Sequence, residues 1–197
     1  MRPDPQARPE YVAAFREIVS RIERGLANAS RRSLPIRMYV AGGAAMHLYT
    51  GERVSEDVDA VFSRRIALPD NLEVAYRDAD GAARMLYFDR QYNDTLGLLH
   101  EDAQQDSVAL TLEGVDPKVI DVRLLSPLDL AVSKIGRLSD QDRADIELLV
   151  RRGLVTPSRL RKRAEEAASG YVGDLGRLRT SIEIACRIAE DAVRRKR

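Results

Sequence analysis

The first third of the chain alternates between helical periodicity and short apolar runs. Apolar side chains recur at helical spacing over residues 9–30, with a proline at the start, which predicts an amphipathic helix. The apolar run 36–40 predicts a buried strand. Two glycines at 42–43 break this strand, and residues 44–49 predict a short helix that Gly51 ends as a C-cap.

The middle of the chain has the pattern of a β-rich region. An Asp-Gly pair at 80–81 separates two alternating runs, which is the signature of a β-hairpin. Turn residues at 114–117 separate two later runs. The predicted strands of this region span residues 57–62, 72–76, 84–88, 107–112 and 118–124.

After Leu125 the pattern becomes helical. Capping residues followed by proline or an acid predict helix starts at Ser126, Ser139 and Thr156. A last helix is predicted over residues 171–196. We therefore expect an α+β fold, with a mixed β-sheet core flanked by helices in residues 1–125 and a helical region in residues 126–197.

Composition excludes several classes of protein. The 197 residues are 44% hydrophobic and 32% charged, which suits one compact domain or a core with a small appendage rather than a disordered chain. We expect no membrane span and no signal peptide, because the chain has neither a long apolar run nor an apolar leader. Its single cysteine cannot form an internal disulfide, and the expected location is the cytoplasm.

The net charge of +1 hides an uneven distribution. Residues 150–197 carry 13 Lys/Arg and 6 Asp/Glu, a net charge of +7, and residues 1–149 carry a net charge of −6. This division suggests an acidic catalytic part beside a basic part that faces a polyanion. The alternative is a set of solvated helix faces in an arginine-rich protein.

The chemistry is concentrated between residues 41 and 59. Asp57 and Asp59 alternate along a predicted strand, so their side chains project from the same face. Two neighbouring carboxylates repel unless a cation lies between them, and hard oxygen ligands suit Mg²⁺ together with substrate phosphates. The Gly42–Gly43 turn lets backbone approach closely, and the N–H groups of the following helix start can meet a triphosphate.

This combination of strand, Gly-Gly turn, helix and Asp-x-Asp strand resembles the nucleotidyltransferase superfamily with the DNA polymerase β-like fold. More narrowly, the chain is similar to the AbiEii-type toxin branch and its relatives. Their R-x-[ST]-x-D-x-D pattern is matched by Arg53, Ser55, Asp57 and Asp59. Their Ser-Pro-x-Asp-Leu-x-x-x-Lys segment is matched by residues 126–134, and an Arg/Asp-rich helix follows at 142–146.

The resemblance implies a Mg²⁺-dependent nucleotidyltransferase, with Mn²⁺ as an alternative ion and a nucleoside triphosphate as substrate. Asp57 and Asp59 would hold the metal, with a third acid supplied by Asp121 or Asp145. Phosphate binding is assigned to a second group of residues: Gly42, Gly43, Arg53, Ser55 and Lys134.

The acceptor of the nucleotide is left open between RNA and protein. Relatives in the toxin branch add nucleotides to tRNA, which suggests that the basic C-terminal region binds tRNA and that a cognate antitoxin exists. A protein hydroxyl, as in adenylylating members of the superfamily, is one alternative. A non-catalytic nucleotide- or partner-binding module is the other.

Overall fold

The computed structural model describes residues 1–93 and 97–195, which form two compact units. Unit 1 comprises residues 1–93 and 107–124, and it contains both β-sheets. Unit 2 comprises residues 97–106 and 125–195 and contains the C-terminal helices. The predicted α+β class is confirmed. The chain enters unit 2 twice, whereas the sequence predicted one crossing after residue 125.

Unit 1 consists of two main helices and seven strands among its described residues. Its elements are α1 (Pro9–Gly25), a 3-10 turn (Arg31–Ser33), β1 (Ile36–Val40), α2 (Gly42–Thr50), β2 (Asp57–Val58), β3 (Ala60–Phe62), β4 (Glu73–Arg77), β5 (Ala83–Phe88), β6 (Val108–Ala109) and β7 (Ile120–Leu124). Gly51 ends α2 in the left-handed conformation, as predicted.

The strands form two separate sheets. The first has the order β3-β1-β7-β6, with β1 parallel to β7 and antiparallel to β3. The second has the order β2-β5-β4, with β2 parallel to β5 and antiparallel pairing in the β4–β5 hairpin. The predicted strand 57–62 is therefore two short strands, one in each sheet, and Asp59 lies between them.

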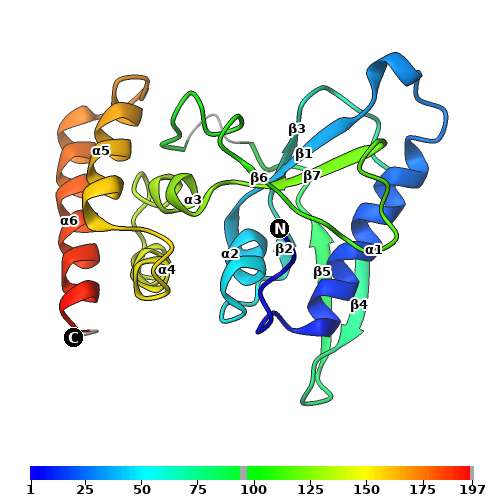
Figure 1. Cartoon of the computed structure of the whole chain (residues 1–197), viewed down its shortest axis with the longest axis horizontal. Helices are drawn as coiled ribbons and strands as arrows, with labels where there is room; N and C mark the ends of the chain where they lie inside the picture. The colour runs from blue at the N-terminus through cyan, green and yellow to red at the C-terminus, as the bar shows by residue number, and fades with distance from the viewer. Residues whose placement is uncertain (94–96, 196–197) are drawn as a thin grey trace. The chain divides into compact units, whose positions relative to one another are not determined.

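Helix α1 covers one face of the β4–β5 hairpin (Figure 1). Its apolar stripe, which includes Tyr11 and Phe15, is buried, as are Leu86 and Phe88 on β5. Phe88 also stacks on Phe62 of β3, with ring centroids 5.8 Å apart, so an aromatic pair links the two sheets. The helix ends at Gly25 rather than near residue 30.

Unit 2 is a helical region whose starts follow the predicted caps. Its helices are α3 (Pro127–Ser133), α4 (Asp140–Arg151), α5 (Pro157–Ala168) and α6 (Leu175–Arg194). Ser126, Ser139 and Thr156 each accept a backbone N–H from the first turn, which confirms these helix starts. The last helix begins four residues later than predicted, and its predicted end at residue 196 lies outside the described residues.

We found no helix with the length and hydropathy of a transmembrane segment in the part of the chain that the structure describes.

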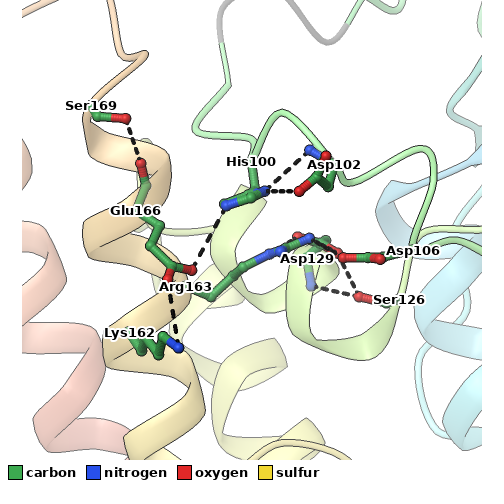
Figure 2. Close-up of polar contacts among 9 residues, drawn as sticks. All are labelled: His100, Asp102, Asp106, Ser126, Asp129, Lys162, Arg163, Glu166 and Ser169. Atoms are coloured by element: carbon green, nitrogen blue, oxygen red, sulfur yellow. Dashed lines mark hydrogen bonds and ion pairs between the residues drawn. The ribbon is translucent and has the colours of Figure 1, made fainter.

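A buried ion pair joins α3, α5 and the segment 97–106 within unit 2 (Figure 2). The Arg163 guanidinium donates to both carboxylate oxygens of Asp129, at 2.7 and 3.0 Å, and also to Asp106 at 2.7 Å. The Asp129 side chain is only 1% exposed, and Ser126 Oγ donates to it at 2.6 Å. Because Asp129 is buried and its carboxylate is held by several donors, removing Arg163 would leave a desolvated charge without its main partner.

We expect Arg163→Met to lower the free energy of unfolding by about 3 kcal/mol or more, the usual cost of breaking a buried ion pair. Lys162→Met is the matched control, because the neighbouring Lys162 side chain is 78% exposed and its pair with Glu166 spans 3.8 Å. The control should change stability by less than about 1 kcal/mol. Chemical denaturation measures both values, and equal losses would contradict the role assigned to Arg163.

Candidate active site

The carboxylate of Asp59 lies against the first residue of α2. Gly42 has a φ of +57°, and a Cβ built on it would lie 1.9 Å from Asp59 Oδ2. The chain is held there by the Ala41 N–H, which donates to the Asp59 carbonyl at 2.8 Å. An N-terminal helix turn has backbone N–H groups without intrahelical partners and a partial positive charge, which stabilises an anion at this point.

The second glycine makes room for the predicted Arg-x-Ser segment. A Cβ on Gly43 would lie 2.5 Å from the Ser55 Cβ and 3.4 Å from the Arg53 guanidinium carbon. Ser55 is buried, and its Oγ donates to the Asp57 carbonyl at 2.9 Å. The structure therefore brings Gly42, Gly43 and the Arg53–Asp59 segment together, with the Ser55 hydroxyl fixing the turn.

Two buried aromatic side chains, Tyr11 and His47, pack beside the Arg53–Asp59 segment. The Tyr11 hydroxyl lies 3.4 Å from Ser55 Oγ, and the Tyr11 ring packs on His47 with centroids 4.5 Å apart. Burial raises the pKa of Tyr11 and lowers the pKa of His47, so both side chains are neutral near pH 7. His47 Nε2 accepts the Arg8 N–H at 3.0 Å, which connects the start of α1 to α2.

Asp89 is a site residue that the sequence analysis did not single out, and it follows Tyr87 and Phe88 at the end of β5. In the parallel pairing of β2 with β5, Asp57 lies opposite Tyr87, and the Asp89 N–H donates to the Val58 carbonyl at 3.1 Å. Asp59 and Asp89 are the residues that directly follow these two paired strands, and both carboxylates act on the Tyr87 hydroxyl. The run Tyr-Phe-Asp at the end of a predicted strand was the only signal, and its partner strand could not be deduced from it.

Several acids lie near the Tyr87 hydroxyl. The negative charge of Asp57 raises the pKa of Tyr87, and burial and three further acids act in the same direction: Asp89, Glu56 and Asp59. A phenol that senses several carboxylates lies in a region of negative potential. Such a region attracts a divalent cation.

Asp121 lies on β7, opposite Arg37 of β1. Its carboxylate pairs with Arg37 at 3.7 Å and with Arg123 at 3.3 Å. Ala41, whose N–H donates to the Asp59 carbonyl, follows the end of β1 and is four residues after Arg37, a distance of about 13 Å along an extended chain. The structure therefore places Asp121 in a pair of arginines and away from the Asp57–Asp59 pair.

Lys134 and Asp145 lie together in unit 2. The Lys134 ammonium is 3.0 Å from Asp145 and 3.8 Å from Asp142, and all three side chains are buried. Burial opposes ionisation of Asp142, but hydrogen bonds from Arg137 and Ser139 outweigh it and lower the pKa of Asp142 to about 2. The side chains of this cluster are paired with one another.

The carboxylates of Asp57 and Asp59 are suitable ligands for one Mg²⁺ ion that is shared with the substrate. Within residues 1–93 and 97–195, no three His, Cys, Asp or Glu side chains converge closely enough to hold a metal ion. Mg²⁺ is commonly bound by one or two carboxylates, with water and substrate phosphates completing the shell. The space that a Cβ on Gly42 would fill lies directly at Asp59, where a phosphate could approach.

A groove in unit 1, with a volume of about 740 Å³, is bounded by the N-terminal segment, α1 and residues 111–113. It contains none of the predicted site residues. The site at Asp59 is supported by the close approach of its carboxylate to Gly42 and by the charge of the neighbouring acids.

We expect Gly42→Ala to be far more destabilising than Gly114→Ala. Both glycines have positive φ, +57° and +76°, so each alanine incurs a backbone strain of about 1–2 kcal/mol. Only at position 42 would the new methyl overlap Asp59, since a Cβ at Gly114 meets nothing within 4 Å. Equilibrium unfolding measures the difference, and equal losses would show that Asp59 is not held against Gly42.

Comparison with known proteins assigns the chain to a family. No curated protein matches it. The model of a family described as a nucleotidyltransferase of unknown function (DUF6036) matches residues 14–179, which include the Gly-Gly turn, the Asp-x-Asp segment and most of the C-terminal helices. Since the match covers most of the 197 residues, the chain belongs to this family of nucleotidyltransferases of unknown function.

Proposed function

We propose that this protein is a Mg²⁺-dependent nucleotidyltransferase that transfers a nucleoside monophosphate from a nucleoside triphosphate to RNA. The observation that carries the proposal is the position of the Asp59 carboxylate, which lies against Gly42 at the N-terminus of α2. This position supports the proposal that a metal ligand and a phosphate-binding helix N-terminus lie at the same place. The family assignment supports nucleotidyl transfer in general.

The triphosphate would bind at the start of α2. Backbone N–H groups of Gly42 and Gly43 would donate to phosphate oxygens, and the nearby Arg53 guanidinium would balance their charge. Asp57 and Asp59 would hold Mg²⁺, with Mn²⁺ as an alternative. When bound, the ion would neutralise charge on the phosphates and on the leaving pyrophosphate.

The reaction would be an in-line displacement at the α-phosphorus. The acceptor hydroxyl oxygen forms a bond to phosphorus, the bond to the β-phosphate oxygen breaks, and pyrophosphate leaves. The hydroxyl proton passes to a carboxylate on the acceptor side. We propose Asp89 for this role, because its backbone is bonded to β2 beside Asp59.

Asp121 and Asp89 are thus rival third acids. Asp121 is held between Arg37 and Arg123, so its carboxylate is already engaged in two ion pairs. Asp89 lies near Asp57 and Asp59, since all three carboxylates act on the Tyr87 hydroxyl. This difference in charge environment favours Asp89.

Incubation with Mg²⁺, each labelled nucleoside triphosphate and total tRNA tests the proposal. We expect label in RNA, and we expect Asp57→Asn and Asp59→Asn to reduce it on the order of a hundredfold or more. Asp89→Asn should also reduce labelling. Asp121→Asn, the matched exchange, should retain most of it.

The other outcomes separate the alternatives. Label in protein instead of RNA would identify a protein adenylyltransferase. Nucleotide binding without any transfer would identify a non-catalytic module. Loss of labelling in Asp121→Asn but not in Asp89→Asn would return the third acid to β7, and labelling unchanged in Asp59→Asn would refute the assigned site.

We extend the proposal to tRNA as the acceptor, bound in part by the basic C-terminal region. Several of its cations are engaged in ion pairs, such as Arg161 with Glu183 at 2.6 Å. Arg159, Arg177 and Arg179 are exposed and could contact phosphates. Two further residues of the predicted basic end, 196 and 197, lie outside the described residues. A toxin role with a cognate antitoxin belongs to the same proposal and rests on the resemblance of the motifs.

Lys134 and Asp145 enter the proposal as a pair. Changing either one alone leaves the other buried without its closest partner, which lowers the free energy of unfolding by about 3–5 kcal/mol. A loss of activity in such a variant could not be told apart from a loss of folded protein. We therefore use the double variant Lys134→Met/Asp145→Leu, which removes both charges together. If the pair acts in transfer, we expect this variant to fold and to lose RNA labelling; a folded variant that labels RNA normally would exclude both residues from the reaction.

A further inference from the structure

Five exposed arginines belong to the two chain segments at the start of β1 in unit 1. Arg31 and Arg32 lie in the 3-10 turn before this strand, and Arg37 is its second residue. Arg64 and Arg65 come just after β3, which is the antiparallel partner of β1. All five residues are exposed, and together they form the β1 basic surface.

Backbone contacts hold these two segments side by side. The Ser63 N–H donates to the Arg37 carbonyl at 2.9 Å, and the Arg37 N–H donates to Ser63 Oγ at 3.0 Å. Further along, Pro69 lies against the end of α1, where a Cβ on Gly25 would be 3.1 Å from the proline ring. The chain that enters β1 therefore runs beside the chain that leaves β3.

The positive charges of this surface are not balanced by acids from the same segments. Residues 24–51 and 60–69 contain no Asp or Glu, although the whole chain has 31 acids for 32 Lys and Arg. Arg37 pairs with Asp121 at 3.7 Å, and its side chain is still 57% exposed. The other four guanidinium groups form no ion pair in the part of the chain that the structure describes.

A group of unpaired arginines is suited to bind phosphates. A guanidinium can donate two parallel hydrogen bonds to one phosphate, and neighbouring cations that repel one another are stabilised by a polyanion. The β1 basic surface has no large exposed hydrophobic side chain for insertion into a membrane. Within the described residues, such side chains lie elsewhere, at Met1, Met85, Tyr87, Val172, Leu175 and Val193. The surface therefore favours a nucleic-acid backbone over an anionic membrane.

The β1 basic surface and the candidate active site lie at opposite ends of one strand. Arg37 is at the start of β1, and Ala41 and Gly42 directly follow its end. Four residues separate Arg37 from Ala41, about 13 Å along an extended chain. A base-stacked strand has one phosphate per about 3.4 Å of its axis. An acceptor that reacts at Asp59 can therefore reach this surface with phosphates a few nucleotides from its end.

We propose that the β1 basic surface binds the phosphate backbone of the RNA acceptor, a few nucleotides from the end that reacts at Asp59. The inference rests on the proposed function for the identity of the acceptor, because the charges alone require only a polyanion with phosphate groups. Phosphate contacts carry no sequence information, so this surface positions the acceptor without selecting its bases.

Binding of a short fluorescent single-stranded RNA, measured by anisotropy over a salt series without nucleotide or metal, tests the surface. The double variant Arg64→Gln/Arg65→Gln removes two exposed cations and breaks no ion pair within the described residues. We expect the slope of log K against log salt to become shallower by about 1.4, because each phosphate contact of a single strand contributes about 0.7.

The matched control, Arg2→Gln/Arg77→Gln, removes the same charge from exposed positions of unit 1 outside this surface. Arg2 follows Met1, whose carbonyl accepts the Thr111 N–H near β6, at the opposite edge of the first sheet from β3. Arg77 is the last residue of β4, in the second sheet. The control should leave the slope unchanged.

Failure of this inference can be distinguished from failure of the proposed function. Wild-type protein that does not bind the RNA, or an Arg64→Gln/Arg65→Gln variant with the wild-type slope, overturns the inference even if nucleotide transfer is observed. An equal change in the control also overturns it, because net charge would then explain the binding. RNA binding that depends on these arginines in a protein without transfer activity supports the surface and refutes the enzyme.

A membrane is tested as the other source of phosphate groups. Vesicles of phosphatidylcholine and phosphatidylserine should bind the wild-type protein and Arg64→Gln/Arg65→Gln equally weakly. Tight binding to these vesicles that is lost in the double variant would assign the surface to a membrane and overturn the inference.

Discussion

The site depends on one steric constraint: the Asp59 carboxylate occupies the space that a side chain at position 42 would need. A glycine at 42 permits both this approach and the positive φ that starts α2 there. Position 43 is constrained in the same way by Ser55. The Gly-Gly turn and the Ser-x-Asp-x-Asp segment are therefore two halves of one packing arrangement, which explains why they occur together.

Asp59 also lies where the chain passes from one sheet to the other. Its carbonyl accepts the N–H of Ala41, which follows β1 of the first sheet. The carbonyl of the preceding residue, Val58, accepts the N–H of Asp89, which follows β5 of the second sheet. Asp59, at the crossing, thereby lies near Asp57 and Asp89 of the second sheet. Because the strand is divided, β5 is paired on both sides, with β2 and with β4.

Local patterns predicted much of the fold but not the pairing of distant strands. The helix caps at Ser126, Ser139 and Thr156 were predictable because each depends on residues within three positions. The division at Asp59 was not, because it depends on β5, some thirty residues away. The same reason hid Asp89, whose neighbour across the sheet is set by the register.

Charge explains why similar residues differ in the chemistry open to them. In unit 2, Asp129 and Asp145 are buried against Arg163 and Lys134, so their charges are already balanced by the protein. These contacts give the Ser-Pro-x-Asp and Lys positions a role in holding helices together that does not require any reaction. Around Tyr87 the neighbouring charges are acids, and bringing them together carries a repulsion that a cation would relieve. If these acids hold Mg²⁺ as proposed, the ion would relieve that repulsion, and the start of α2 would add N–H donors for a phosphate. This difference in charge is the physical argument for proposing Asp57 and Asp59, rather than the ion pairs of unit 2, as the site of the reaction.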